Sequence, residues 1–511
     1  MQAVSRIFSM SSWTGTYSAI GSDMDGKWGP ERPLGIRSVA RWSSFAAVAA
    51  LIGPTVSAAP ALPPPVVAVL EHEGLPASSL SVLVQALDED RPRVSHLVDV
   101  PRNPASAMKI VTTWAALNLL GPGYTWTTQV RADRQPVKGR IQGNLYLKGS
   151  GDPFLVTERF WRLLSTVRRK GVNEIAGDFV VDRSVFDLDE PARGEFDGKP
   201  QRAYNVEPDG ALLNFGATEI HIERRAGRKR PLVQIDPPLL GLRIENALAF
   251  VDRPCRGRLN IQLFTEAGVS PGLRVTGKFP RRCRRTLLLR AVVSHEAYAR
   301  GLVGHLWREV GGTLHGSVRN GRMPEGAEVI AEHESEPFAL LGWRLNKFSN
   351  NVMARQVFLS MGREAEEAPG TIDKGRKAVK RWLASQGLDH PSLFIDNGSG
   401  LSRTVRVRAD TLGKLLAHAY RSPLRAEFVA TFPLAAVDGT LAKRFRDSPV
   451  AGRAHLKTGL LSGVRALAGY VHGMGGKRYL VVSLQNHPGV QRGAGTRVQN
   501  ALLAWISTLS G

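Results

Sequence analysis

The pattern of apolar and polar positions divides the chain into three stretches. The first contains a strand-like run at Ser79–Leu87 and a helical pattern over Ala105–Leu120, which an Asn-Pro pair opens and a Gly-Pro-Gly run stops. The second, residues 125–291, consists of short alternating runs separated by turn residues, with one helical pattern at Thr157–Lys170. Helical patterns dominate from His295 onward. We therefore expect a β-rich region between two helix-containing parts.

The third stretch also contains strand-like runs, and the order of its elements predicts the fold. It ends in a strand, a turn, a strand and a helix, the pattern of an antiparallel sheet covered by helices. We expect a multidomain α/β (α+β) protein. The strand-like runs of this stretch are Glu328–Ala331, Leu393–Ile395, Leu467–Val471 and Tyr479–Leu484, and its helical patterns are His295–Val310, Pro337–Lys347, Asn351–Met361, Ile372–Gln386, Ala409–Tyr420 and a last one from about Thr496.

Length and composition fit a globular protein of two or three packed units. The chain has 511 residues, of which 43% are hydrophobic and 22% are charged. Its formal net charge of +23 is unusual. A basic surface keeps a protein in solution, or it attracts an anionic wall polymer or an anionic membrane surface. Nucleic acid is not an expected partner, because the sequence has no zinc-finger spacing, RNP-like signature or basic zipper region.

The N-terminal region has the three parts of a secretory signal peptide. Two arginines precede the apolar run Phe45–Ile52, and small residues up to Ala58 follow it. The run is too short to span a membrane, so we expect cleavage after Ala58 and loss of residues 1–58. Because the basic residues stand unusually far from Met1, Met24 is an alternative start. The predicted location of the mature chain is the periplasm, in solution or peripherally on a membrane.

Two cysteines occur in the chain, Cys255 and Cys283. In an oxidising compartment, a single pair is expected to form one disulfide. Neither cysteine belongs to a Cys-x-x-Cys motif or lies beside a histidine cluster in the sequence, so a catalytic or metal-binding role is not expected. The sequence predicts neither a metal site nor a cofactor.

The first candidate for chemistry is Ser106-Ala107-Met108-Lys109. A serine and a lysine three positions apart on a helix share one face, so the amine can reach the hydroxyl. A lysine kept neutral by burial or by a cationic neighbour can take the proton of that serine and make it a nucleophile. Ser-x-x-Lys also arises by chance in a chain of this length, so the pattern alone does not identify a catalytic site.

Two further motifs carry polar groups that suit a cleft. Ser349-Asn350-Asn351 falls between two helical patterns, where its hydroxyl could pass a proton to a leaving amine and an amide could hold a peptide carbonyl. Helix capping is the alternative explanation of these residues. Lys457-Thr458-Gly459 precedes a strand-like run, and its lysine and threonine could bind a terminal carboxylate. An ordinary turn with an exposed lysine is the alternative for this motif.

The three motifs together are far more specific than each alone. Each occurs once, in an order and context typical of penicillin-binding proteins and class A β-lactamases. The 243 positions from Ser106 to Ser349 leave room for an insert that a simple β-lactamase lacks. The chain therefore resembles the class C low-molecular-mass penicillin-binding proteins, the D-alanyl-D-alanine carboxypeptidase/endopeptidase family that includes penicillin-binding protein 4. Short sequence motifs elsewhere in the chain support this resemblance: Gly149–Pro153, Leu345–Lys347, Asp396–Ser402 and Val437–Leu441.

This resemblance implies a fold, a reaction and a role for each motif residue. The fold is a transpeptidase/β-lactamase-like domain, residues 59–124 and 292–511, split by two nested β-rich domains, residues 125–291. The reaction is hydrolysis of D-Ala-D-Ala termini or D-Ala–meso-diaminopimelate cross-bridges of peptidoglycan through an acyl-serine, and β-lactams acylate the same serine. The implied roles are nucleophile for Ser106, general base for Lys109, proton shuttle for Ser349, orientation of the peptide and of Lys109 for Asn351, positive potential for Lys457, carboxylate contact for Thr458, close approach of substrate at Gly459, and an oxyanion hole from the backbone N–H groups of Ser106 and Leu460.

Two positions depart from the family pattern. Leu460 stands where relatives usually carry serine or threonine, so a hydroxyl that could bind the terminal carboxylate is missing. We therefore expect carboxypeptidase activity to be weakened relative to endopeptidase activity. Asn350 stands where many relatives have aspartate, which should matter little because no chemistry is assigned to that position.

Two other functions remain as alternatives. A β-lactamase or esterase of the same fold would need a carboxylate that activates water for deacylation, and the sequence does not show which residue that is. A non-catalytic, basic wall-binding protein would explain the net charge, but such a protein has no need of both motif lysines.

Overall fold

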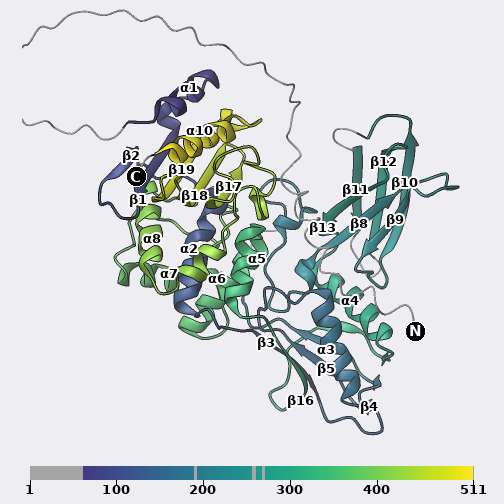
Figure 1. Ribbon diagram of the computed structural model, residues 1–511. Coiled ribbons are helices and arrows are strands. Elements are labelled where there is room, and N and C mark those ends of the chain that lie inside the picture. The colour runs from purple at the N-terminus through teal and green to yellow at the C-terminus, as the bar shows by residue number, and fades with distance from the viewer. Residues whose placement is uncertain (1–60, 189–192, 256–259, 267–270, 510–511) are drawn as a thin grey trace, which may run out of the picture.

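The computed structural model describes residues 61–188, 193–255, 260–266 and 271–509, and the predicted signal peptide, residues 1–58, lies outside these ranges. Figure 1 shows a body in which the N-terminal (purple) and C-terminal (yellow) segments lie together, and an inserted region (teal) built from the middle of the chain. Within the described ranges, no helix is both long enough and apolar enough to cross a bilayer.

The body is built on a five-stranded antiparallel sheet, in the order β17 (Ala454–Leu461), β18 (Val464–His472), β19 (Arg478–Asn486), β1 (Leu80–Ala86) and β2 (Pro92–His96). β1 comes from the start of the described chain and pairs with β19 from its end, with Leu80 opposite Gln485 and Ala86 opposite Tyr479. This pairing joins the two parts of the body that the insert separates in the sequence. β17 is an edge strand, so one side of it remains open.

Helices cover both faces of this sheet and form two hydrophobic cores. β18 is buried along almost its whole length as a result, and its sequence is a nearly continuous apolar run. The first core contains α1 (Pro64–His72) and α10 (Ala494–Thr508), and the second contains α2 (Lys109–Leu119), α5 (Phe338–Lys347), α6 (Asn351–Glu366), α7 (Ile372–Ser385), α8 (Ala409–Arg421) and α9 (Arg425–Ala430).

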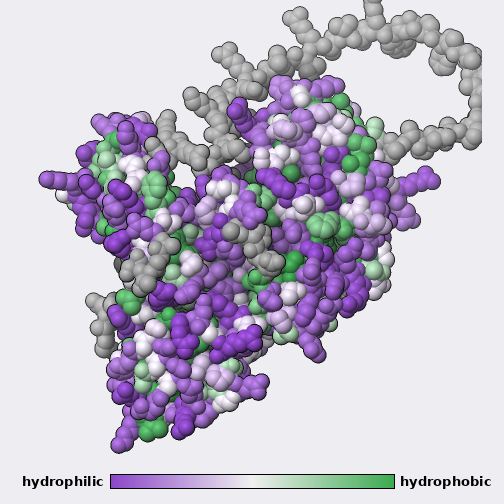
Figure 2. Space-filling model, turned by 180° about the vertical axis from the view of Figure 1, so that it is seen from behind, coloured by the Kyte–Doolittle hydropathy of each residue, from purple (hydrophilic) through white to green (hydrophobic). Residues whose placement is uncertain are grey.

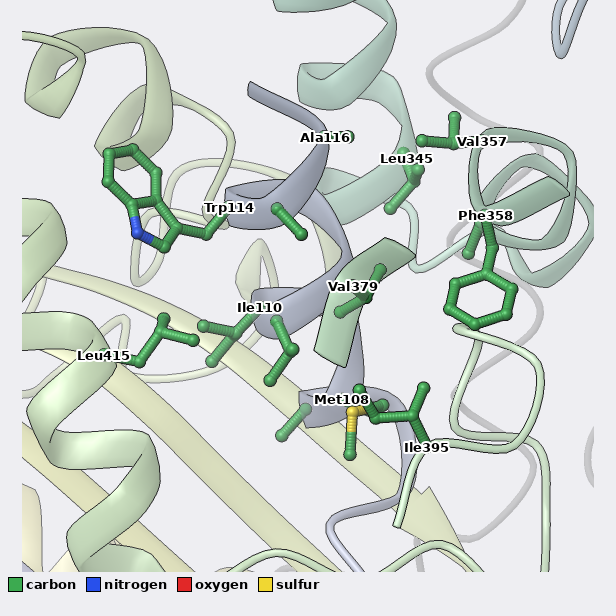
Figure 3. Packing of buried hydrophobic residues seen from close by; sticks show 14 of the residues in the cluster. Met108, Ile110, Trp114, Ala116, Leu345, Val357, Phe358, Val379, Ile395 and Leu415 are labelled. Atoms are coloured by element: carbon green, nitrogen blue, oxygen red, sulfur yellow. The ribbon is translucent and has the colours of Figure 1, made fainter. Parts of the chain in front are cut away.

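α2 runs through the middle of the second core. Ile110 and Trp114 are fully buried on it, and Figure 3 shows that Val379 of α7 and Leu415 of α8 lie around it. A helix that is apolar all round is stable only inside a protein. Its first residue, Lys109, is therefore carried into the interior with the helix and has no exposed surface.

The insert begins with a mixed sheet, and the insert as a whole has one large hydrophobic core. The sheet packs against α3 and α4, and their apolar faces share one hydrophobic cluster. A small three-stranded sheet lies beside it. The five strands, in order, are β15 (Val318–Asn320), β7 (Phe179–Asp182), β5 (Leu145–Lys148), β3 (Thr127–Ala132) and β16 (Glu328–Glu334), the small sheet is β14 (Thr313–Leu314), β6 (Glu174–Ile175) and β4 (Arg140–Ile141), and the helices are α3 (Thr157–Arg169) and α4 (His295–Glu309).

A second unit of the insert projects from the molecule in Figure 1. It consists of two three-stranded sheets, and Cys255 and Cys283 form a disulfide that joins the segment after β10 to the turn before β13. The sheets are β13 (Arg285–Arg290), β8 (Thr218–Glu223) and β9 (Leu232–Asp236), and β10 (Arg243–Val251), β12 (Gly272–Pro280) and β11 (Asn260–Glu266).

The insert ends later than the predicted boundary at residue 291. α4 follows that boundary, yet Tyr298 and Leu302 pack in the core of the insert. β16 then pairs with β3, with Glu328 opposite Ala132. The chain re-enters the body only between β16 and α5. The helical pattern from His295 onward gives the correct element type, but periodicity does not show which core a helix faces.

Other differences concern individual strands. The sequence pattern does not predict β10 or β12, because charged residues, a glycine and a proline interrupt their apolar positions. The predicted strand Leu393–Ile395 is reduced to an isolated bridge between Phe394 and Arg406. Lys457–Gly459 was expected before a strand and instead lies within β17.

Candidate active site

Ser106 lies in a short 3-10 turn, η3 (Ala105–Met108), that leads directly into α2. Ala105 has a φ of +46°, a left-handed conformation that is uncommon for a residue other than glycine. Asn103 supports this conformation, because its Oδ1 accepts a hydrogen bond from the Ala105 N–H at 2.8 Å. The local sequence thus presents the Ser106 hydroxyl at the buried start of a helix.

Two glycines hold this turn in place by allowing close approach. A Cβ on Gly459 of β17 would collide with the Pro104 carbonyl, and one on Gly400 would collide with the Ala105 carbonyl. Gly400 also has a φ of +75°, which favours glycine. Gly459 therefore has a packing role toward the turn that bears Ser106.

The Lys109 amine has three oxygen neighbours. Its Nζ lies 3.0 Å from Ser106 Oγ, 2.6 Å from Asn351 Oδ1 and 2.5 Å from the Ser399 carbonyl oxygen. The amide and backbone oxygens can only accept hydrogen bonds, so they take two N–H groups of the amine. A neutral amine then has its lone pair left for the Ser106 hydroxyl, which is the geometry of a base beside a nucleophile.

The electrostatic surroundings favour that neutral form. Burial lowers the pKa of Lys109 well below its usual range, and the positive charges of Lys457 and Arg355 lower it further. Burial also lowers the pKa of Lys457, to about 7. Because Lys109 has two cationic neighbours, it gives up its proton first and Lys457 keeps its charge longer.

Ser349 and Asn351 are placed by a helix end and a helix start in immediate succession. Ser349, with a φ of +56°, ends α5, and the Asn350 N–H donates to the Leu345 carbonyl across this turn at 2.9 Å. The Asn350 side chain caps α6 by accepting from the Met353 N–H. Asn350 is thus a structural cap, while its two neighbours face the catalytic groups.

Lys457 connects the strand to the loop motif. Its Nζ lies 2.7 Å from Ser349 Oγ and 2.9 Å from the Thr458 carbonyl oxygen, and its side chain has no exposed surface. Ser106 and Lys109 on the helix, Ser349 and Asn351 on the loop, and Lys457 on the strand therefore meet in one place through direct contacts.

The open edge of β17 presents backbone donors beside this cluster. The Leu456 N–H points away from β18, because it donates to the Pro433 carbonyl at 2.9 Å. Alternate N–H groups of a strand point the same way, so the N–H groups of Thr458 and Leu460 face the open edge as well. Thr458 Oγ1 lies 3.0 Å from Thr440 Oγ1, and the Leu460 side chain is 49% exposed.

Several groups of the site cannot be recognised in the sequence, because they do not depend on the type of residue. The Ser399 carbonyl binds Lys109, and the Tyr204 carbonyl accepts from Asn351 Nδ2 at 3.1 Å. The position of a backbone oxygen cannot be predicted from the sequence, although the short motif Asp396–Ser402 does mark the loop that carries Ser399. Thr440 lies in the short motif Val437–Leu441, and the sequence predicts no role for it.

Comparison with known sequences gives a match over almost all of the described chain. Residues 65–509 match the D-Ala-D-Ala carboxypeptidase 3 (S13) family. The chain is 32% identical over 431 residues to a D-alanyl-D-alanine carboxypeptidase of Actinomadura sp. (strain R39). This alignment covers 80% of this chain and 77% of the relative. It is 27% identical over 387 residues to D-alanyl-D-alanine carboxypeptidase DacB of Haemophilus influenzae, which covers 75% of this chain and 80% of the relative.

Solved structures share the fold of both the body and the insert. Penicillin-binding protein 4 (dacB) from Haemophilus influenzae superimposes with a TM-score of 0.74 at 23% identity, over 87% of this chain and 99% of that chain. The same protein in complex with a β-lactam gives a TM-score of 0.69 at 23% identity, over 84% and 96% of the two chains. The predicted fold class is confirmed.

Proposed function

The chain belongs to the D-Ala-D-Ala carboxypeptidase 3 (S13) family, and we propose that Ser106 is the serine through which it hydrolyses peptidoglycan peptides. It is a serine-type D-alanyl-D-alanine carboxypeptidase of the penicillin-binding protein 4 group, as the resemblance of its motifs predicts. Family membership removes the alternative of a non-catalytic wall-binding protein.

In the acylation step, Ser106 Oγ attacks the carbonyl carbon of the penultimate D-alanine while neutral Lys109 takes the hydroxyl proton. The backbone N–H groups of Ser106 and Leu460 stabilise the negative oxygen of the tetrahedral intermediate. The C–N bond to the last residue then breaks, and the Ser349 hydroxyl gives its proton to the leaving amine. The proton that Lys109 took from Ser106 replaces it on Ser349, so Lys109 is neutral again before deacylation. Water attacks the acyl-serine, which releases the shortened peptide and restores the Ser106 hydroxyl.

One observation carries this assignment: the set of contacts around Lys109. Two acceptors, Asn351 Oδ1 and the Ser399 carbonyl, occupy its N–H groups, and the third neighbour is the Ser106 hydroxyl. Together with the lowered pKa, this arrangement supports a lysine that acts as a base. A structural lysine in a protein interior would instead be paired with a carboxylate.

The strand edge is suited to the end of a peptide. Lys457 supplies positive charge, and Thr458 with its neighbour Thr440 supplies hydroxyl groups for a terminal carboxylate. Leu460 offers its N–H but no side-chain hydroxyl. We therefore propose that the missing hydroxyl weakens carboxypeptidase activity relative to endopeptidase activity in this enzyme.

β-Lactams are the covalent inhibitors that this mechanism implies. The Haemophilus influenzae penicillin-binding protein 4 forms a complex with a β-lactam. A β-lactam carries a strained amide carbonyl and a carboxylate, so the Ser106 hydroxyl and the Lys457–Thr458 edge suit it in the same way as a D-Ala-D-Ala end. Ring opening leaves an acyl-serine without a departing amine.

The location proposed for this enzyme is the periplasm, in solution or peripherally on a membrane. The predicted signal peptide, the disulfide and the wall substrate support this location. Basic residues could add attraction to an anionic wall or membrane surface at one end of the β8–β13 unit, where the Arg224 N–H donates to the Arg284 carbonyl at 2.9 Å. Figure 2 shows the hydrophilic surface of this projecting unit. The exposed basic side chains at this end are Arg224, Arg225, Arg228, Lys229, Arg230, Arg281, Arg282, Arg284 and Arg285.

Purified muropeptides test the proposed function. Cross-linked dimers and monomeric pentapeptides are incubated with the enzyme and with Ser106→Ala. The products are separated, and their masses are measured by mass spectrometry. We expect the wild type to release monomers or D-alanine, and the folded variant to release neither. Cleavage by a folded Ser106→Ala protein would show that another residue is the nucleophile.

A further inference from the structure

The insert contributes a backbone oxygen to the catalytic cluster. Tyr204 lies in η4 (Ala203–Asn205), a short turn of the insert, and its carbonyl accepts from Asn351 Nδ2 at 3.1 Å. The two ends of an amide differ, because Nδ2 can only donate and Oδ1 can only accept. With Nδ2 bound to Tyr204, Oδ1 must face Lys109, where it lies 2.6 Å from Nζ. The insert thereby sets the orientation of Asn351.

α6 holds the same insert segment, residues 204–209, at two further points. The Arg355 guanidinium donates from Nη1 to the Val206 carbonyl at 3.3 Å. Gln356 Oε1 accepts from the Asp209 N–H, and its Nε2 donates to the Asp209 carbonyl, both at 2.9 Å. The segment is therefore laid along the first two turns of α6.

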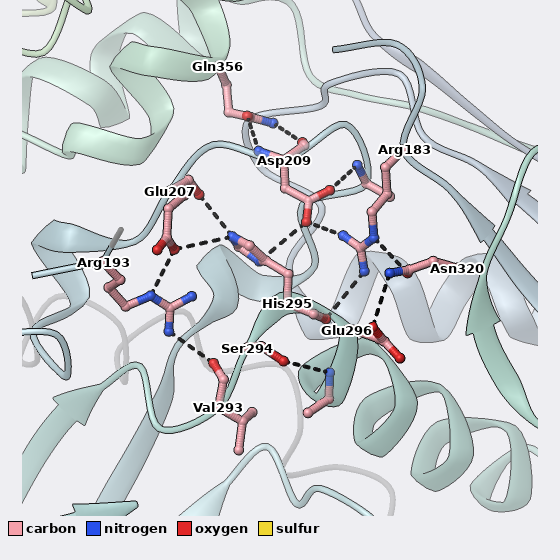
Figure 4. Close-up of polar contacts among 12 residues, drawn as sticks. Arg183, Arg193, Glu207, Asp209, Val293, Ser294, His295, Glu296, Asn320 and Gln356 are labelled. Atoms are coloured by element: carbon pink, nitrogen blue, oxygen red, sulfur yellow. Dashed lines mark hydrogen bonds and ion pairs between the residues drawn. The ribbon is translucent and has the colours of Figure 1, made fainter. Parts of the chain in front are cut away.

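A charged cluster fixes this segment from the side of α4, as Figure 4 shows. His295 lies 3.4 Å from Asp209 Oδ2 through Nδ1 and 3.0 Å from the Glu207 carbonyl through Nε2. Arg183 pairs with the Asp209 carboxylate, and Arg193 pairs with Glu207 at 2.8 Å. The segment is held on both sides, so its carbonyls have fixed positions relative to α6.

Arg355 also brings charge to this wall of the site. It follows Asn351 by one helical turn on the same face of α6, and only 7% of it is exposed. The charged groups that act on Lys109 are Lys457 from β17 and Arg355 from α6. Lys457 titrates near neutral pH, whereas an arginine keeps its charge throughout.

We propose that Arg355 is a positioning residue of the hydrolase site, which fixes the insert segment against Asn351 and keeps a permanent positive charge beside Lys109. This inference rests on the proposed function, in which Lys109 is the base for Ser106. Because the base must be neutral, the acylation rate falls when the pH drops through the pKa of Lys109. Removal of a neighbouring positive charge raises that pKa. The acid limb of the pH–rate profile, in which the acylation rate falls toward low pH, then moves to higher pH.

A matched control lies on the same helix. Arg363 of α6 donates from Nη1 to the Ser150 carbonyl of the insert at 2.8 Å and also contacts the Tyr124 hydroxyl. It therefore ties α6 to the insert as Arg355 does, but its charge is not among those that lower the pKa of Lys109. Arg363→Gln removes a structural link of the same kind without removing a charge from the site.

The experiment compares Arg355→Gln, Arg355→Lys and Arg363→Gln with the wild type. The second-order rate constant for acylation by benzylpenicillin is measured at intervals from pH 4 to 9, and thermal denaturation shows that each protein is folded. We expect the acid limb of Arg355→Gln to move up by about one pH unit, with an about tenfold slower rate below the limb. Arg355→Lys and Arg363→Gln should keep the limb of the wild type.

The outcomes separate this inference from the proposed function. If the folded wild type is not acylated, the proposed function fails. If the wild type is acylated and Arg355→Gln only lowers the plateau without moving the limb, Arg355 is structural and this inference alone is wrong. If Arg355→Gln does not fold, Arg355→Lys decides: a limb displaced by more than half a pH unit despite the retained charge would overturn the inference.

Discussion

The helix side and the strand side of the site each bury a lysine completely, and the surroundings of the two amines differ. Lys109 meets an amide oxygen, a backbone carbonyl and the Ser106 hydroxyl. Lys457 meets one backbone carbonyl and the Ser349 hydroxyl. Lys109 also lies near two other cations, whereas burial alone lowers the pKa of Lys457.

Burial does not by itself make a lysine a base. Both side chains lose solvation to the same extent, so the added positive charge decides which one is neutral at a working pH. On this account, Lys109 removes protons and Lys457 attracts negative charge and orients Ser349. The two positions should therefore respond differently to substitution.

The largest effect is expected for Lys109→Met. The variant keeps a flexible side chain in the interior but has no base, so acylation by benzylpenicillin should slow by about 10²–10⁴-fold. Stopped-flow or quench measurements of the acylation rate check this. A folded Lys109→Met that is acylated within about threefold of the wild-type rate would show that proton removal does not pass through this lysine.

Lys457→Met should have the next largest effect and a different pH signature. In the wild type, the acylation rate should fall as the pH rises through about 7, because Lys457 loses the proton that gives it its charge. The variant should be about 10²-fold slower and should lack this alkaline limb. A wild-type rate that stays constant from about pH 6 to 9 would contradict a charged Lys457.

Leu460→Thr tests the strand side more gently. The position is exposed on an edge strand, and threonine is well accepted in strands, so the fold should not suffer. One added hydrogen bond to the terminal carboxylate should raise D-alanine release from a pentapeptide roughly threefold to tenfold. Cleavage of a cross-linked dimer by the same variant is the control. If the ratio of the two activities does not change, the missing hydroxyl does not set the preference.

Much of the body is predictable because its strands and helices have strong local patterns. The largely apolar sequences of β18 and α2 identify two buried elements from local pattern alone. The three motifs identify Ser106, Ser349 and Lys457 because each needs a particular side chain at a particular spacing. Nothing local in the sequence specifies the long-range pairing of β1 with β19, and only the structure shows it.

The rest of the site depends on backbone atoms and on tertiary packing. The carbonyls of Ser399 and Tyr204 bind Lys109 and Asn351, and any residue type can supply a carbonyl. The end of the insert was misplaced for a related reason, because the apolar face of α4 fits either core as a pattern. Asn350 caps α6, which is the alternative explanation that the sequence offers for that motif.

The smallest predicted effect is a loss of thermal stability at low pH, caused by titratable groups of the insert segment that packs against α6. Burial alone would raise the pKa of Asp209, but His295 and Arg183 bring it below its usual value, so its stabilisation is lost as the pH falls through that lowered pKa. Burial lowers the pKa of His295 below 6.5, so the unfolded chain takes up that proton more readily and stability falls below about pH 6.5.

Both groups make the protein less stable in acid, and thermal denaturation at neutral pH and at about pH 5 checks the contribution of His295, because Asp209 loses its stabilisation only at lower pH. The melting temperature should fall by roughly 2–4 °C for each kcal/mol that is lost between neutral pH and pH 5. His295→Gln should show a smaller decrease over the same interval, because glutamine does not titrate. An equal or larger decrease in the variant would show that this histidine does not contribute to the acid sensitivity of the insert.

The most direct measurement of the central claim is the mass of the intact protein after incubation with benzylpenicillin, for the mature form and for Ser106→Ala. We expect a single covalent adduct on the wild type, located by peptide mapping at Ser106, and none on the variant. An unmodified wild type that is folded, or an adduct that persists in Ser106→Ala, would contradict the account.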